Sequence, residues 1–190
     1  MNDEYVLYQK MIIQYMNYLP YVNDHSGLLV YLCNKYKCES AIPLFSEDSY
    51  KVFLAFEEII ASKSVVDIGN VLGVREQIFQ IVWNRLEQYC NLIPDTHGVL
   101  RAIRKSLGSS YPRYLYSIAD MVWSYSNVDS VDFNYYTKRA ILSLILAKVM
   151  KKFRNDYSFK YSETKDFLRD QLESVVFIGI LKKRLKSFLK

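Results

Sequence analysis

The chain has 190 residues, half of them hydrophobic and a quarter charged, which is typical of one globular domain and excludes a disordered protein. Only 6 glycines and 4 prolines are present, so long helices are expected rather than a many-stranded sandwich. Residues 1–95 carry a net charge of −5 and residues 96–190 a net charge of +10, so the C-terminal half favours an anionic partner.

Four helices are expected in the first 62 residues, three of them short. Pro20 ends the first helix, and a turn over residues 23–27 precedes the second. The predicted ranges are 5–19, 28–36, 39–45 and 50–62. This order is typical of a tetracycline-repressor-type fold, in which three N-terminal helices form a helix-turn-helix head.

Longer helices are expected from residue 63 onward. Asp132 is the predicted N-cap of one helix, and Ser162 is the predicted N-cap of the last. The predicted ranges are 74–90, 99–107, 113–125, 133–153 and 163–189. No repeat or linker divides the chain. We therefore expect one domain over 1–190, an all-α bundle of about nine helices with a head over 1–62.

The segment 140–150 is apolar on nearly every side, because only Ser143 and Lys148 are polar. A helix of this kind must be buried all round. Three interpretations stay open: a central core helix, a subunit interface, or the wall of a lipid pocket. The surplus of 17 tyrosines and 10 phenylalanines suits a pocket or contact surface, although an aromatic core explains it equally well.

The end of the last predicted helix is amphipathic and basic. Lys182, Lys183 and Lys186 are the residues predicted to contact an anionic membrane. An ordinary solvated basic face explains the same pattern. The longest apolar run is far shorter than the ~20 residues that a membrane-spanning helix needs, and the acidic start of the chain resembles neither a secretory signal nor a transit peptide.

No catalytic motif stands out in the chain. The two histidines and three cysteines lack metal-ligand spacing, and there is no phosphate-binding loop, nucleophile elbow or Glu-x-x-His pair. The pair Glu57-Glu58 is interpreted as a solvated helix face. We therefore expect a protein that is not an enzyme and has no cofactor. We also expect no nucleic-acid binding, because segment 38–47 at the recognition position has two acids and no base.

A nine-residue motif, Asp-Phe-Asn-Tyr-Tyr-Thr-Lys-Arg-Ala over 132–140, resembles the signature of the coenzyme Q biosynthesis protein nine family. Trp123 and Asp120 lie upstream at the family's spacing, and Phe167-Leu168, Leu172-Glu173 and Gly179 follow downstream. The resemblance extends over about 73–188. The chain departs from the family where Tyr135 replaces a tryptophan, where Val122 interrupts a Met-Trp dipeptide, and where Asn127-Val128 replaces Gly-Asp.

The resemblance implies a repressor-like fold without DNA binding, a homodimer through the last two helices, and an apolar pocket for a lipid or quinone tail. It implies that the rest of the chain after the head, 63–190, forms this lipid pocket and the dimerisation helices. It also implies a partner, the hydroxylase that acts on the quinone ring. The residues predicted to bind lipid are Trp83, Tyr116, Ile141, Leu144 and Ile145. Those predicted to bind the partner are Trp123, Asp132, Tyr135, Tyr136 and Arg139. The alternative is that Asp132 only caps a helix and Arg139 only pairs with an acid.

The leading hypothesis is a non-catalytic accessory protein of ubiquinone biosynthesis that binds an isoprenoid quinone intermediate, or a phospholipid, and presents the intermediate to the hydroxylase. It would lie peripherally on the bacterial inner membrane from the cytoplasm, or on the matrix side in a processed mitochondrial form. A repressor-like regulator that senses a hydrophobic ligand is the alternative. A purely structural helical dimer is the third hypothesis.

Overall fold

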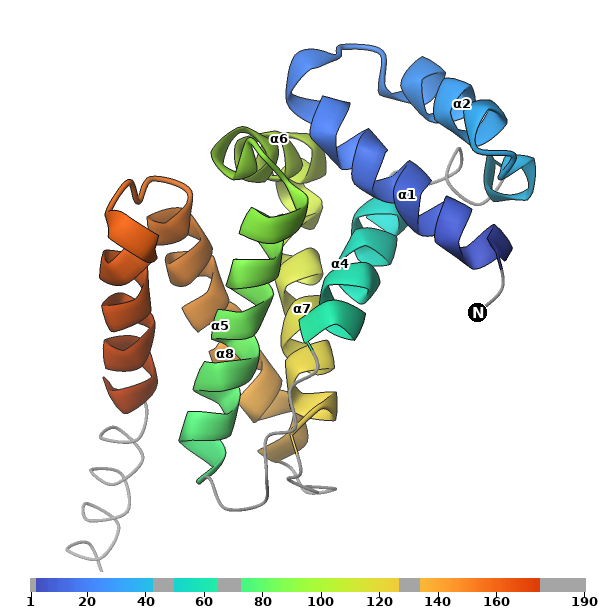
Figure 1. Cartoon of the computed structure of the whole chain (residues 1–190). Helices are drawn as coiled ribbons and strands as arrows, with labels where there is room; N and C mark the ends of the chain where they lie inside the picture. The colour runs from blue at the N-terminus through green and yellow to red at the C-terminus, as the bar shows by residue number, and fades with distance from the viewer. Residues whose placement is uncertain (1–2, 43–49, 65–72, 127–133, 175–190) are drawn as a thin grey trace, which may run out of the picture.

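The computed structural model describes residues 3–42, 50–64, 73–126 and 134–174. Within these ranges the chain forms helices and no strand, which confirms the all-α class (Figure 1). The longer helices are α1 (Asp3–Tyr18), α2 (His25–Lys35), α4 (Tyr50–Ser64), α5 (Val74–Leu92), α6 (Thr96–Leu107), α7 (Tyr111–Ser124), α8 (Asn134–Phe153) and a last one whose described part is 162–174. The 3₁₀ turns are η1 (Leu19–Tyr21), η2 (Glu39–Ala41), η3 (Gly108–Ser110) and η4 (Phe159–Tyr161).

In the N-terminal part, α1 packs against α2 and α4. The first helix ends at Tyr18 and Pro20 lies in the following 3₁₀ turn, so the predicted stop is confirmed. The predicted helix 39–45 begins as η2, and its residues 43–45 lie outside the described ranges. Most of the recognition position therefore falls in or beside that gap, and the helix-turn-helix character and the count of about nine helices stay predictions.

Two helices begin three residues earlier than predicted, for the same physical reason. The side chain of Asp24 accepts a hydrogen bond from the Gly27 amide at 2.9 Å, and that of Asp95 accepts one from the Gly98 amide at 2.8 Å. Each aspartate is thus the N-cap of a helix whose third residue is glycine. A Cβ at Gly98 would lie 2.0 Å from an Asp95 oxygen, so any other residue there would have to displace the capping carboxylate from its present position.

The C-terminal part is a bundle in which α7 packs along α8 and α5, and α4 bridges to α5 and α7. Figure 1 shows the helix over 162–174 on the outside of the bundle. Contacts hold it there: Arg169 lies over the Phe79 ring of α5, and Lys152 of α8 pairs with Glu163 at 2.5 Å. One hydrophobic core runs from Met11 in α1 to Leu172.

The last helix does not begin as predicted. Ser162 lies inside the helix, and earlier residues bind its first amides. Asp156 accepts from the Thr164 amide at 2.7 Å, and the Ser158 hydroxyl accepts from the Glu163 amide at 3.2 Å. The predicted cap at Ser162 is therefore wrong, because the chain folds back and brings a buried aspartate to the helix start.

The apolar segment of α8 is not buried on every side. Leu142, Ile145 and Val149 are buried, whereas Leu144 is 67% exposed and Ile141 is 36% exposed. A central helix enclosed by its own chain is therefore ruled out as the interpretation of residues 140–150 in the described fold. A subunit interface and a lipid-pocket wall remain. None of the described helices combines the length and apolar character needed to cross a bilayer.

Candidate functional site: an apolar groove beside an aromatic surface

A groove of about 240 Å³ opens where α5, α7, α8 and the last helix meet. The four elements contribute nine residues: Val74, Arg75 and Ile78, then Trp123, then Lys138, Ile141, Leu142 and Ile145, and finally Leu172. Only two of the nine, one arginine and one lysine, carry charge. Such a wall suits hydrocarbon, because burial of a methylene contributes ~0.8 kcal/mol and needs no polar partner.

Trp123 forms the α7 side of the groove. Its ring is half-buried, and its indole nitrogen is buried without a hydrogen-bond partner among the described residues. The Lys138 ammonium lies over the same ring, 5.4 Å from its centroid. A buried N–H without an acceptor is costly, so a ligand with an oxygen atom at this end would be favoured over pure hydrocarbon.

Next to the groove, α7 and α8 are joined by a compact polar cluster. The buried guanidinium of Arg139 pairs with Asp120, and the Tyr135 hydroxyl donates to the same carboxylate oxygen at 3.3 Å. The Arg139 guanidinium also lies 3.3 Å from the Tyr135 ring centroid. Arg139 is thus paired with an acid, as the structural alternative predicted. Arg139 and Tyr135 therefore join α7 to α8 within the chain itself, without a partner.

Tyr136 is the predicted partner residue that is most available. It is 71% exposed, and its ring packs edge-on against Tyr135 with centroids 5.1 Å apart. The cluster below therefore orients an exposed phenol at the start of α8. Asp132, the fifth predicted partner residue, lies outside the described ranges, as do Lys182, Lys183 and Lys186.

The five residues predicted to bind lipid do not meet in one place. Ile141 and Ile145 line the groove, whereas Leu144 of the same helix is 67% exposed and is not part of the lining. Tyr116 is half-buried on α7, one turn before Asp120, and lines none of the cavities described here. Sequence reasoning did not anticipate the α5 wall at Val74, Arg75 and Ile78.

Trp83 belongs to a different cavity, of about 420 Å³, between α5, the end of α8 and η4. Its indole nitrogen donates to Glu87 at 2.6 Å, and the Lys165 ammonium lies 5.0 Å from its ring centroid. The lining also includes Cys90, Phe153 and Tyr161. Trp83 and the groove residues therefore cannot contact the same short ligand segment.

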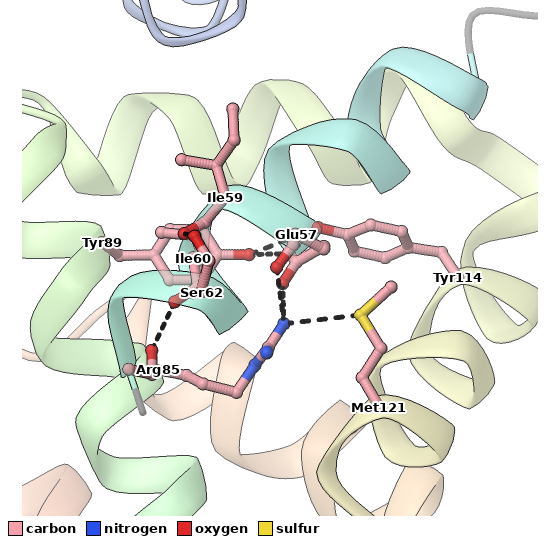
Figure 2. A network of polar contacts seen from close by, with 9 residues as sticks. Glu57, Ile59, Ile60, Ser62, Arg85, Tyr89, Tyr114 and Met121 are labelled. Carbon is pink, nitrogen blue, oxygen red and sulfur yellow. Dashed lines mark hydrogen bonds and ion pairs between the residues drawn. The ribbon is translucent and has the colours of Figure 1, made fainter. Parts of the chain in front are cut away.

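A buried polar network in the core was missed by the sequence interpretation. Glu57, taken as solvated, is fully buried, and its carboxylate pairs with Arg85 at 2.5 Å (Figure 2). Tyr89 and Tyr114 both donate to the other carboxylate oxygen. A signal was present: Glu57 follows Phe53 by four residues and precedes Ile60 by three, so it lies on their buried face.

This network connects α4 with α5 and α7. None of the cavities described here gives a substrate access to it. Burial, followed by the charge of Glu57, raises the pKa of Tyr89 and of Tyr114 well above 10. Both phenols therefore stay protonated donors. We interpret the network as a structural tie. The described residues contain no group of three or more His, Cys, Asp or Glu side chains that could hold a metal ion.

The part of the chain that forms most of the groove matches a known protein family. Residues 109–179 match the family model described as COQ9. The chain is 33% identical over 73 residues to proteins named "Ubiquinone biosynthesis protein COQ9, mitochondrial" from Homo sapiens and Bos taurus, and it matches the Rattus norvegicus protein at the same identity. The aligned stretch covers 38% of this chain and only 23% of each relative. The family match over 109–179 is narrower than the expected 73–188, yet it contains Trp123, Tyr135 and Ile141.

Proposed function

We propose that this chain, whose residues 109–179 match the COQ9 family model, is a non-catalytic accessory protein of ubiquinone biosynthesis. Its role is to bind an isoprenoid quinone intermediate and present it to the quinone-ring hydroxylase. The observation that carries the proposal is the apolar groove, most of whose walls come from the matched segment.

The groove is smaller than the roughly 300–1,000 Å³ of most small-molecule sites. It therefore holds only part of an intermediate, the oxygenated ring end with the first part of the isoprenoid tail. Its α7 end has Trp123 with a free indole N–H and Lys138 above the ring, which suit a carbonyl or hydroxyl oxygen. A ligand with an oxygenated ring and an apolar tail would provide an oxygen for the Trp123 end and hydrocarbon for the apolar wall, whereas a plain hydrocarbon would provide only the second contact.

Presentation requires a partner surface close to the ligand. Tyr136 lies on α8 within two turns of Ile141, so a hydroxylase bound at Tyr136 would lie near the ligand. Partner-binding energy is commonly concentrated in a few exposed aromatic residues of this kind. We place the protein as a peripheral protein on the matrix side, in line with the mitochondrial relatives; the bacterial inner membrane is the alternative.

A homodimer is part of the proposal. The exposed side of α8, with Leu144 at 67%, is apolar and would be covered by a second copy of the chain. The groove residue Ile141 and Leu144 lie less than one turn apart, which provides a matched pair for experiment. One substitution addresses the ligand and the other addresses the dimer.

The test is equilibrium binding of a short-chain isoprenoid quinone, followed by tryptophan fluorescence. Ile141→Gln should weaken binding at least ten-fold, because it puts an amide into the hydrocarbon wall. Leu144→Gln, on the same helix but outside the groove, should bind as the wild type does. Equal binding by all three proteins would refute the groove as the ligand site.

A further inference from the structure

The turn between α8 and the last helix carries the two most exposed large hydrophobic side chains of the described residues. Phe159 is 82% exposed and Tyr157 is 77% exposed. Burial of a phenylalanine side chain stabilises a protein relative to its exposure to water. Because these two neighbouring rings remain exposed and lack this stabilisation, we expect them to contact a surface outside the chain.

The turn is held in shape rather than loose. The Asp156 carboxylate accepts from the Ser158 amide at 2.8 Å and from the Thr164 hydroxyl at 2.5 Å. On the other side, the His97 ring of α6 stacks on Tyr157 with centroids 4.6 Å apart, and His97 Nδ1 lies 3.0 Å from the Arg154 carbonyl oxygen. These contacts fix the backbone from which the two rings project.

The backbone conformation at the turn is unfavourable on its own. Lys160 and Tyr161 have φ values of 51° and 54°, which is the left-handed region. That region is sterically unfavourable for an L-residue. The local hydrogen bonds offset this cost, and the result is a turn in which Phe159 and Lys160 are exposed, with Lys160 at the edge of the cavity that contains Trp83. Strained backbone that is retained in this way is commonly found at functional surfaces.

The charge around the rings is positive. Residues 151–160 contain Lys151, Lys152, Arg154 and Lys160, and Asp156 is their single acid. The Asp156 carboxylate is buried and fully engaged by Ser158 and Thr164. Glu163, the nearest acid that follows, is paired with Lys152. The Lys160 ammonium lies 5.4 Å from the Phe159 ring centroid, so one base stands directly beside an exposed ring.

We propose that this turn (Tyr157, Phe159 and Lys160) is a contact site for an anionic phospholipid membrane, with the two rings in the headgroup layer and the bases on the lipid phosphates. Aromatic rings favour the boundary between water and hydrocarbon, and each nearby lysine or arginine strengthens binding to an anionic surface. The turn projects at the end of a helical hairpin, at the end of the bundle where α6 lies (Figure 1). A projecting tip suits a membrane better than a pocketed protein interface.

This inference goes beyond the proposed function, because it concerns neither the groove nor residues 182–186. The test is sedimentation with vesicles of phosphatidylcholine and phosphatidylglycerol. The double variant Tyr157→Ser/Phe159→Ser should partition at least ten-fold more weakly than the wild type. Tyr31→Ser, which removes a ring that is 59% exposed on α2, should not change the partition. Ile141→Gln should also keep it, so the groove and the turn can fail separately.

A second measurement locates the contact without loss of a side chain. In Phe159→Trp, the added fluorescence should be quenched by vesicles that contain brominated lipid, whereas in Tyr31→Trp it should not. Wild-type partition by the double variant, or no quenching in Phe159→Trp, would overturn the proposal. Loss of binding only on Lys182, Lys183 and Lys186→Glu would do so as well, since it would place the contact elsewhere in the chain.

Discussion

At the junction of α7 and α8, the contacts of the Asp120 carboxylate determine which nearby side chains remain available to a partner. Asp120 binds both Arg139 and Tyr135, so these two residues serve the fold first. Tyr136, which takes no part in that cluster beyond its ring contact, remains exposed. Changing Tyr135 would therefore disturb the helix junction as well as the surface, and Tyr136 is the sharper position for a test of partner binding.

Tyr136→Lys should leave thermal melting unchanged and weaken capture of the quinone-ring hydroxylase by about thirty-fold, which corresponds to about 2 kcal/mol for an aromatic anchor. Co-purification with the hydroxylase measures the effect. Tyr31→Lys, which changes an exposed tyrosine on α2, is the matched control. Wild-type capture by Tyr136→Lys would show that the partner binds elsewhere.

Glu57→Gln should lower the free energy of unfolding by about 3–5 kcal/mol, because it leaves the buried Arg85 charge without its partner. The adjacent exposed residue gives a control: Glu58→Gln should stay within about 0.5 kcal/mol of the wild type. Urea unfolding followed by circular dichroism compares them. Similar midpoints for the two variants would contradict the structural role of the network.

Some of these residues could be predicted from the sequence and others could not. The pairing of Arg139 with an acid was predicted as an alternative. Glu57 was wrongly assigned to a solvated face, because the charge of its side chain was given more weight than its spacing from buried residues. Helical periodicity places a residue on a face, but it does not reveal which helix covers that face. The α5 wall of the groove therefore became apparent only in the fold, and Trp83 turned out to line another cavity.

At the scale of helices, the caps set the boundaries that periodicity missed. Apolar spacing locates the middle of a helix, and an Asp-x-x-Gly sequence extends it N-terminally by one turn. Both Asp24 and Asp95 act in this way. Asp95 does more, because its second oxygen accepts from the Tyr21 hydroxyl at 2.8 Å and so joins η1 to α6.

Asp95→Ala should lower the stability by about 1 kcal/mol at neutral pH through the lost cap. Hydrogen bonds from the Gly98 amide and from Tyr21 hold the pKa of Asp95 below 3.8 in the folded state. Its stabilising effect is therefore complete above the unfolded value and is lost as the pH falls through the folded value. Asp95→Asn keeps the cap and isolates this pH-dependent part. Urea midpoints that differ equally from the wild type at all pH values would contradict the assignment.

At the scale of the molecule, the all-α class followed from scarce glycine and proline and from long apolar periodicities. The number of helices and the repressor-like head stay predictions, because residues 43–49 lie outside the described ranges. The exposed apolar side of α8 is a second case in which the sequence pattern does not identify what surrounds a helix. The sequence predicted that this helix must be covered, but a single chain does not reveal whether a second subunit covers it.

The central claim is that this chain carries an isoprenoid quinone species, and native mass spectrometry of the freshly purified protein tests it most directly. The account predicts an added mass that tandem fragmentation identifies as an isoprenoid quinone or its precursor, present in the wild type and in Leu144→Gln and strongly reduced in Ile141→Gln. Protein masses without any added lipid, or added lipid that is unaffected by Ile141→Gln, would contradict it.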